Sequence, residues 1–299
     1  MKYVDYQYIS HNHVEHEIHA ELNYGARGSK RAKKKKPTPL QIAKQNHWKK
    51  VNCCRRTIQM NFKEGDLWVT LAYKAGTRKD MKDFQKDIVD FQNMLRNVYK
   101  KEGHEFYWIR RLEIGKRGGL HAHFIINNIP NAPKLIQDSW KKTVKEAGRV
   151  YFTTIDEENG FEGLAEYICK DPEEEIQGQL CFLTPESRKK LVSISSSRNL
   201  QRPQPVAKRI NPWSIKEILT GQQVIRPTEG FYIETDSVKA GINKYTGLPY
   251  LRYRETREKP KKPEKPIITQ KPSKPHRPPE KKKKTVIDKV KGFFKKLRR

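Results

Sequence analysis

The chain has 299 residues, 35% of them hydrophobic, and a formal net charge of +29. It contains no run of about 18 apolar residues and no apolar signal-peptide core, which excludes a membrane-spanning helix and favours a cytoplasmic protein. The charge favours polyphosphates or anionic lipid surfaces as partners. The four cysteines include no C-x-x-C pair and are expected to be reduced thiols.

Composition divides the chain into five segments. Residues 1–37 are polar and end in a run of lysines, so we expect a disordered basic arm. A globular domain is expected over residues 38–215, followed by a small β appendage over residues 216–257. Residues 258–284 are rich in Pro and Lys, which predicts an extended linker that does not collapse. Residues 285–299 place apolar side chains on one helical face and lysines opposite, as in a basic amphipathic helix.

The first part of the globular domain has the pattern of a helix, a strand and a second helix. Residues 38–62 carry apolar side chains at roughly helical spacing. Residues 66–73 alternate bulky apolar residues with threonine and alanine, as strands do. Residues 80–103 predict an amphipathic helix that Asp80 starts and Gly103 stops.

The next part predicts a hairpin and three further elements. Residues 105–114 and 120–127 have strand patterns and are joined by the turn sequence KRGG. A helix is expected at residues 134–146, a strand at residues 149–155 and a short helix at residues 160–170.

Two more short strands are expected in the appendage, at residues 230–236 and 250–255. Helices and strands in this order suit an antiparallel sheet with helices packed on it. The fold class is therefore expected to be α+β, with a central antiparallel sheet.

Two histidines, His121 and His123, begin the apolar strand of the hairpin. A strand points residues i and i+2 to the same face, and the hairpin turn folds Glu113 back beside them. Two neutral imidazoles and one carboxylate can hold a divalent cation and leave positions for water or a phosphate oxygen. The ordinary alternative is a pair of surface histidines on an edge strand. His11 and His13 have the same spacing without the strand or the acid, and we assign them no site.

A second pair of chemically capable residues lies in the helix expected at residues 160–170. Tyr167 and Lys170 are three positions apart and would share a helical face. The ammonium group of Lys170 can favour the phenolate of Tyr167 or steady charge near a scissile phosphate. Alone the pair means little, because most such pairs are a half-buried ring beside a solvated amine. Its position downstream of the histidine strand gives it weight.

These motifs, in this order, resemble those of the HUH endonucleases, and specifically the rolling-circle replication initiators that use a single tyrosine. The family's LTLTY-type strand is matched by WVTLAY at residues 68–73. Its His-hydrophobic-His strand is matched by GLHAHFIIN at residues 119–127, and its Tyr-x-x-Lys helix by YICK at residues 167–170. The resemblance covers about residues 38–203 and is to the branch found in Gram-positive phages, plasmids and mobile elements. Ala122 is smaller than the family's usual bulky residue between the histidines.

The resemblance implies site-specific nicking and joining of single-stranded or hairpin origin DNA. It makes Glu113, His121 and His123 the ligands of Mg²⁺ or Mn²⁺. It makes Tyr167 the nucleophile, which leaves a 5′-phosphotyrosine and a free 3′-hydroxyl that primes rolling-circle replication. Lys170 would help to position the phenolate or the phosphate.

Further partners are suggested by other cations of the chain. Lys116 and Arg117 in the hairpin turn, and Arg198 in SSSRNLQRP, are candidate contacts to DNA phosphates, although such cations are often only solvated. No G-x-x-x-x-G-K-[ST] sequence occurs, so unwinding would need a host helicase, and synthesis a host polymerase. The helix at residues 285–299 would suit an anionic membrane surface or a protein partner, or would dock on its own domain or on DNA.

Two other functions stay open at this point. One is a relaxase or single-tyrosine transposase of a mobile element, with the same chemistry and a different purpose. The other is a basic DNA-binding protein, tethered to a membrane, whose nuclease site is inactive. The joint presence of all five candidate metal-binding and catalytic residues argues against an inactive site.

Overall fold

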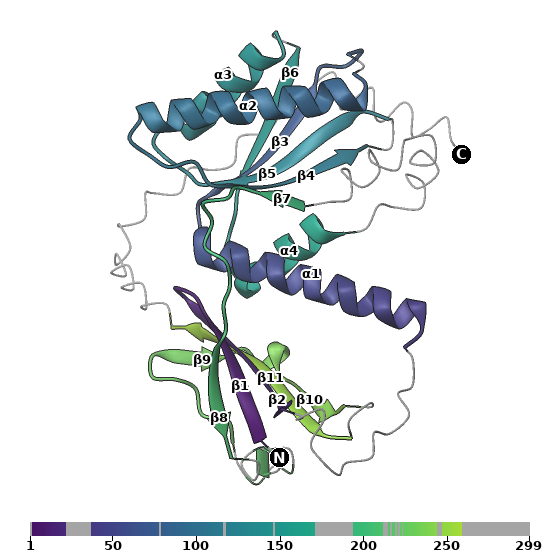
Figure 1. The fold of residues 1–299 in the computed structure, drawn as a ribbon. Helices are drawn as coiled ribbons and strands as arrows, with labels where there is room; N and C mark the ends of the chain where they lie inside the picture. Colours follow the sequence, from purple (N-terminus) through teal and green to yellow (C-terminus); the bar gives the residue numbers. More distant parts are fainter. Residues whose placement is uncertain are drawn as a thin grey trace, which may run out of the picture. The chain divides into compact units, whose positions relative to one another are not determined.

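The computed structural model describes most of the first 258 residues (Figure 1). The described residues are 2–21, 37–77, 79–115, 118–145, 147–170, 194–211, 215, 217, 218, 220, 222, 224–243 and 247–258. Among them, no helix is long and apolar enough to cross a lipid bilayer. The lysine run at residues 33–36, nearly all of the expected linker, and the helix expected at residues 285–299 lie outside the described residues.

A five-stranded antiparallel sheet carries the candidate site residues. Its strand order is β6-β3-β5-β4-β7, so the histidine strand β5 is central. The strands are β3 (Leu67–Tyr73), β4 (Trp108–Ile114), β5 (Leu120–Ile126), β6 (Gly148–Thr154) and β7 (Ile194–Ser196). The predicted hairpin is formed by β4 and β5. The α+β class predicted from the sequence is confirmed.

One face of this sheet is covered by α2 (Met81–Lys101) and α3 (Ala132–Thr143) (Figure 1). Helix α2 begins as expected, because the side chain of Asp80 accepts a hydrogen bond from the amide of Asp83 and so satisfies a free amide of the first turn. The apolar stripe of α2 packs against the β5 positions that alternate with the histidines, among them the fully buried Phe124. Sheet and helices together enclose the larger hydrophobic core.

The opposite face carries His121 and His123 and is covered in part by α1 (Pro39–Asn61) and α4 (Glu162–Cys169). Helix α4 is entered through the turn η1 (Glu158–Phe161). A second hydrophobic core fills the space between these helices and the sheet. The histidine end of the face stays accessible, since the side chain of His121 is 21% exposed.

Residues 2–21 form a hairpin, where composition suggested a disordered arm over residues 1–37; residues 22–36 lie outside the described residues. The hairpin consists of β1 (Lys2–Ile9) and β2 (His13–Glu21). The expectation was wrong because polar residues occupy buried strand positions. Asp5 and His16 are 3% and 5% exposed, and the His16 Nδ1 atom lies 2.8 Å from the Asp5 carboxylate. Polar groups that pair with each other are tolerated inside a protein, so the hairpin is a core element despite its composition.

The hairpin belongs to a second, six-stranded sheet. Its order is β10-β11-β2-β1-β8, with β9 paired to β11. Its other strands are β8 (Val206–Ile210), β9 (Phe231–Ile233), β10 (Lys239–Ile242) and β11 (Pro249–Arg257). A short 3-10 helix, η2 (Thr235–Ser237), lies between β9 and β10 in the chain. The two strands expected in the appendage are present as β9 and β11, but the appendage is not separate, because β11 pairs with the N-terminal β2. Both sheets lie in one compact unit, Met1–Glu258.

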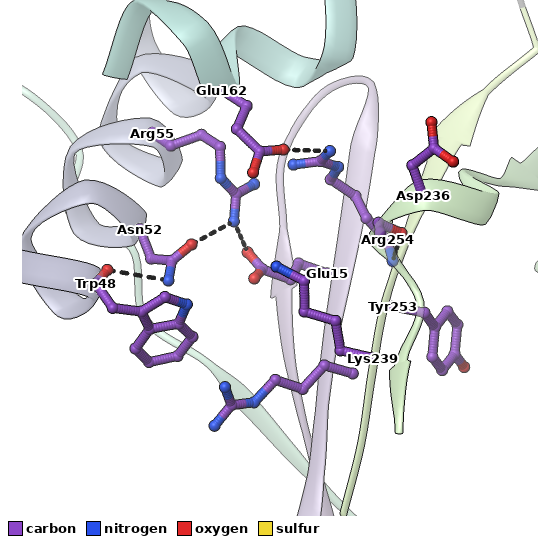
Figure 2. A pocket seen from close by; sticks show the side chains of 11 residues that line it. Glu15, Trp48, Asn52, Arg55, Glu162, Asp236, Lys239, Tyr253 and Arg254 are labelled. Atoms are coloured by element: carbon purple, nitrogen blue, oxygen red, sulfur yellow. Dashed lines mark hydrogen bonds and ion pairs between the residues drawn. The ribbon is translucent and has the colours of Figure 1, made fainter. Parts of the chain in front are cut away.

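Ion pairs join the second sheet to the helices α1 and α4. Arg55 and Arg56 of α1 donate hydrogen bonds to the carboxylate of Glu15 on β2, at 2.6 and 2.7 Å. Arg254 of β11 donates to Glu162 of α4 at 3.0 Å. These groups, apart from Arg56, line a small cavity of about 60 Å³ (Figure 2). Burial alone would raise the pKa of Glu15, but the bonds and charges of the two arginines lower that pKa to about 2.

Candidate active site

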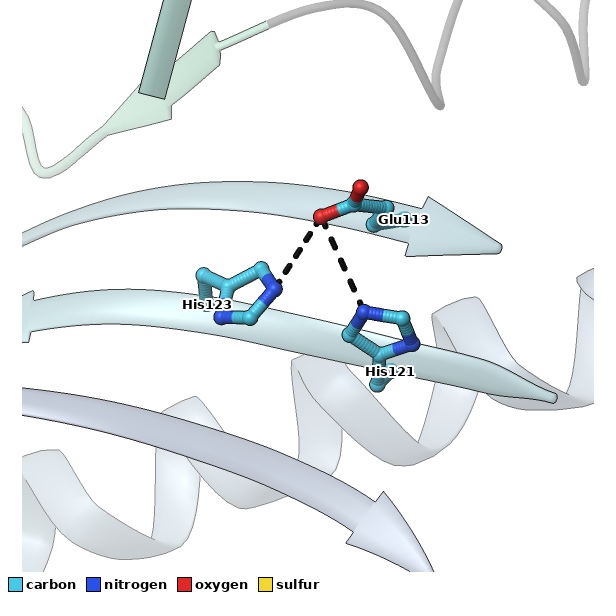
Figure 3. A group of neighbouring side chains, drawn as sticks. All are labelled: Glu113, His121 and His123. Carbon is cyan, nitrogen blue, oxygen red and sulfur yellow. Dashed lines mark ion pairs between the residues drawn. The ribbon is translucent and has the colours of Figure 1, made fainter. Parts of the chain in front are cut away.

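Glu113, His121 and His123 form a cluster on one face of the five-stranded sheet (Figure 3). The Nε2 atom of His123 lies 3.1 Å from Oε2 of Glu113, and Nε2 of His121 lies 3.7 Å from the same oxygen. The hairpin produces this cluster because Glu113 and His121 are directly opposed across β4 and β5. His123 is the next position on the same face. The juxtaposition expected from the sequence is present in the structure.

Each histidine ring is also held through its other nitrogen, Nδ1. The Nδ1 atom of His121 lies 3.3 Å from the carbonyl oxygen of Gly119, and that of His123 lies 3.0 Å from the hydroxyl of Thr70. A carbonyl oxygen can only accept a hydrogen bond, so neutral His121 carries its proton on Nδ1 and presents a lone pair on Nε2. Metal-binding histidines commonly have this arrangement, in which a hydrogen bond at one nitrogen orients the other toward the ion.

The cluster fits a divalent cation in both spacing and charge. Ligand atoms of Mg²⁺ lie about 2.1 Å from the ion, which places neighbouring ligand atoms roughly 3 Å apart, close to the two separations in the cluster. Contacts with His121 and His123 hold the pKa of Glu113 far below its usual range, so the carboxylate is ionised at neutral pH. The buried Nε2 atom of His123 makes no hydrogen bond of good geometry. An ion would satisfy this buried nitrogen.

Tyr167 lies on α4 beside the cluster and is 47% exposed, although the two positions that follow it, Ile168 and Cys169, are buried. Its ring meets that of His123 edge-on, with 5.7 Å between the ring centroids. It meets Trp68 of β3 in the same way, at 5.5 Å. The three sequence motifs, one on β3, one on β5 and one on α4, therefore converge on one group of rings. His123 belongs both to this group of rings and to the cluster with Glu113 and His121, so the tyrosine and the candidate metal ligands lie side by side.

Lys170 lies just beyond the tyrosine helix. Helix α4 ends at Cys169, and Lys170 is its C-cap residue with an extended backbone, ψ 134°. The helix predicted through residue 170 therefore ends one residue earlier. The side chain of Lys170 is exposed, and its role stays a prediction.

Arg198 lies away from the metal-ligand cluster. It is exposed and follows β7, where the amide of Ser197 donates to the carbonyl of Trp108 on β4. Trp108 precedes Glu113 by five strand residues, which is roughly 16 Å at about 3.3 Å per residue. A phosphate bound by Arg198 would therefore lie far from the cluster. The other two expected phosphate contacts, at residues 116–117, lie outside the described residues.

A hollow beside the cluster was not apparent from the sequence. It is a cavity of about 660 Å³ lined by Thr70 and Ala72 of β3, by His121, and by Lys74 and Lys79 from the segment between β3 and α2. The two lysines did not stand out in a chain with 63 Lys and Arg. Strand pairing is what brings them near the histidines, because β3 lies directly beside β5. The alternation of apolar and polar residues predicts that a segment is a strand, but it does not predict which other strand will pair with it.

Residues 66–172 match a family model of replication-associated proteins, described under the name ORF2. This segment is less than half of the chain, but it runs from the start of β3 to just beyond α4 and contains all five candidate metal-binding and catalytic residues. Comparisons with curated proteins and with solved structures found no match. Residues 66–172 are therefore similar to replication-associated proteins of the ORF2 type, which supports a role in the initiation of DNA replication, with DNA as the partner.

Proposed function

We propose that the protein nicks and rejoins single-stranded or hairpin origin DNA by a metal-assisted transesterification that starts rolling-circle replication. The observation that carries this proposal is the meeting of three metal-ligand side chains and an exposed tyrosine on one face of the sheet. The sequence similarity of residues 66–172 to replication-associated proteins also supports this proposal.

The metal would be Mg²⁺ or Mn²⁺, held by Glu113, His121 and His123. When bound, it supplies positive charge that stabilises the charge developing on the scissile phosphate. Three protein ligands leave coordination positions for phosphate oxygens and water. The Thr70 hydroxyl and the Gly119 carbonyl contact the Nδ1 atoms of the two imidazoles and would keep their Nε2 atoms turned toward the ion.

Tyr167 would be the nucleophile. Its phenolate oxygen forms a bond to phosphorus, the bond between phosphorus and the 3′ oxygen breaks, and that oxygen takes up a proton to become the 3′-hydroxyl. The proton of the phenol passes to solvent. The 5′-phosphotyrosine product keeps the energy of the phosphodiester, so attack by a 3′-hydroxyl rejoins the strand. Lys170, at the end of α4, would favour the phenolate or neutralise the phosphate.

The surroundings of the cluster suit a nucleic-acid strand. The cavity beside His121 has a volume typical of ligand sites, which span about 300–1,000 Å³. Lys74 and Lys79 line it and would neutralise phosphates. Tyr151 of β6 lies opposite Thr70 and is 57% exposed, so it offers a ring on which a base can stack. A host helicase and polymerase would complete replication, and residues 285–299 would contact a membrane surface or a protein partner.

Incubation of the full chain with Mn²⁺ and a labelled library of single-stranded origin sequences tests the proposal. A covalent protein–DNA adduct should form, map to Tyr167 by peptide mass, and be lost with EDTA and in Tyr167→Phe. Tyr232→Phe is the matched control, because Tyr232 of β9 is 48% exposed, nearly as much as Tyr167, and has no place in the proposed site, so this variant should keep the adduct. Binding of DNA without an adduct in any divalent cation would reject the nuclease and leave a DNA-binding protein.

A further inference from the structure

Arg111 links the strand that carries Glu113 to the helix that carries Tyr167. It lies on β4, two residues before Glu113 and on the same face, directly opposite His123 of β5. Arg111 is 3% exposed. A buried guanidinium is costly unless its donors find acceptors, so the contacts of this side chain show what it holds together.

Its guanidinium finds acceptors at the C-terminal end of α4. The Nη1 atom lies 3.0 Å from the carbonyl oxygen of Ile168 and 3.4 Å from that of Tyr167, and it also contacts the carbonyl of Lys170. The last carbonyls of a helix have no partner within the helix, and a positive charge is favourable there. The carbonyl of Cys169 accepts a bond from Lys50 of α1 at 3.5 Å. Arg111 therefore contacts three of the four carbonyls of residues 167–170, which are the last turn of α4 and its C-cap.

The two ends of α4 are held by different groups. Glu162 at the N-terminal end accepts a bond from Arg254 of β11, and the carbonyls at the C-terminal end accept bonds from Arg111 and Lys50. Helix α4 has eight residues, and its N-cap residue, Phe161, makes no side-chain capping bond. The buried side of α4 packs against the second hydrophobic core through apolar contacts, which attract without fixing a direction. The contacts to α4 all come from Nη1, and the planar guanidinium fixes the directions in which this nitrogen donates, so they set a direction as well as an attraction. Tyr167 lies at the end of α4 that Arg111 contacts, so the bonds from Arg111 act on the rotation of the helix at the position of the tyrosine.

We propose that Arg111 is a positioning residue that sets the distance and orientation of Tyr167 relative to the metal ligands. It acts through the backbone of α4 and touches neither the metal nor the DNA. This inference rests on the proposed function of Tyr167 as the nucleophile. Displacing a reacting group by about 1 Å can cost about a hundredfold in rate. Loss of Arg111 should therefore slow phosphotyrosine formation and leave the affinities for Mn²⁺ and for DNA nearly unchanged.

The preceding residue of β4 offers a matched control. Arg110 points to the opposite face of the sheet, where it donates to Gln92 of α2 at 2.7 Å. Arg111→Gln and Arg110→Gln remove the same charge from adjacent positions of one strand, but only the first removes bonds to α4. Arg111→Lys and Arg110→Lys keep the charge and remove the planar fork of donors.

Single-turnover formation of the adduct should fall roughly a hundredfold in Arg111→Gln, recover in part in Arg111→Lys, and change little in Arg110→Gln. The dissociation constant of Mn²⁺, measured by calorimetry, should be the same in all of them. Equal losses of rate in Arg111→Gln and Arg110→Gln, in step with equal losses of thermal stability, would reduce Arg111 to a structural residue and overturn the inference.

A second readout does not depend on nicking. A single fluorotyrosine at position 167 reports the ring currents of Trp68 and His123 through its ¹⁹F chemical shift. Arg111→Gln should move or broaden this signal, and Arg110→Gln should not. A signal that Arg111→Gln leaves unmoved overturns the inference, whether or not an adduct forms. A moved signal in a protein that forms no adduct upholds the positioning and rejects the proposed nuclease.

Discussion

Trp68 stacks on His123, with 5.2 Å between the ring centroids and 15° between the planes. The same indole meets Tyr167 edge-on, so a residue of β3 connects the histidine strand to the tyrosine helix. Stacked and edge-to-face rings have preferred geometries, and Trp68 therefore restricts the orientation of both partners. Strand β3 therefore supports the site through the ring of Trp68 and the hydroxyl of Thr70, whereas the three candidate metal ligands come from β4 and β5.

The metal-ligand cluster predicts a stability that depends on Mn²⁺. A ligand that binds only the folded protein stabilises it by about 2.7 kcal/mol at a hundred times its dissociation constant. Mn²⁺ should therefore raise the melting temperature, and EDTA should reverse the rise. Glu113→Gln should remove most of the effect, whereas His11→Asn should keep it, because His11 is exposed and outside the cluster. A Mn²⁺-dependent rise of equal size in Glu113→Gln would place the ion elsewhere.

Thr70→Val tests the hydroxyl that holds His123. The substitution keeps the shape of the side chain and removes the 3.0 Å contact to Nδ1. Partners of metal-bound histidines are typically worth 10–100-fold in metal affinity or activity, and we expect a loss of about that size in Mn²⁺ affinity by calorimetry. Thr153→Val is the control, since Thr153 is an exposed threonine of β6 on the same sheet. Similar Mn²⁺ affinities in the two variants would show that the ring needs no such support.

The contact between Glu15 and the arginines of α1 predicts a dependence of stability on pH. The pKa of Glu15 is lowered from 4.5 to about 2 in the folded protein, so its stabilisation is complete above about pH 4.5 and is lost as the pH falls toward 2. The shift corresponds to roughly 3 kcal/mol. Urea unfolding should show Glu15→Gln to be less stable than the unchanged protein at pH 7.

That difference in the free energy of unfolding should shrink to near zero at about pH 2. Glu21→Gln, at the exposed end of the same strand, should track the unchanged protein at every pH. A Glu15→Gln difference that stays constant from pH 7 to pH 2 would contradict the ion pairing.

Ala122→Leu tests the departure from the family pattern between the two histidines. Ala122 is fully buried and faces the core beneath α2, away from the cluster. Adding methyl groups to a well-packed core typically costs 1–3 kcal/mol, and we expect a loss of about that size in the free energy of unfolding. The affinity for Mn²⁺ should stay the same, because the histidines lie on the other face. A gain in stability would show that the small residue leaves unfilled space.

The sequence was sufficient where the information is local. The hydrophobic pattern of α2, with Asp80 as its N-cap, predicted a helix that the structure shows with nearly the same bounds. The juxtaposition of Glu113 with His121 followed from a hairpin whose two strands are joined by a short turn. In both, the residues that interact lie close together along the chain, so one face and one turn determine the outcome.

Contacts between distant parts of the chain were decided by the tertiary structure alone. The strand β2 was hidden because its buried His16 pairs with Asp5, and because its neighbour β11 lies more than 200 residues away. Nothing in the sequence distinguishes Arg111 from other cations on strands, because the C-terminal carbonyls of α4 that it contacts lie more than 50 residues away in the chain. Composition and periodicity report whether a side chain is apolar, and they do not report which distant group will meet a polar one. Burial of a polar residue is stable only once that partner is in place.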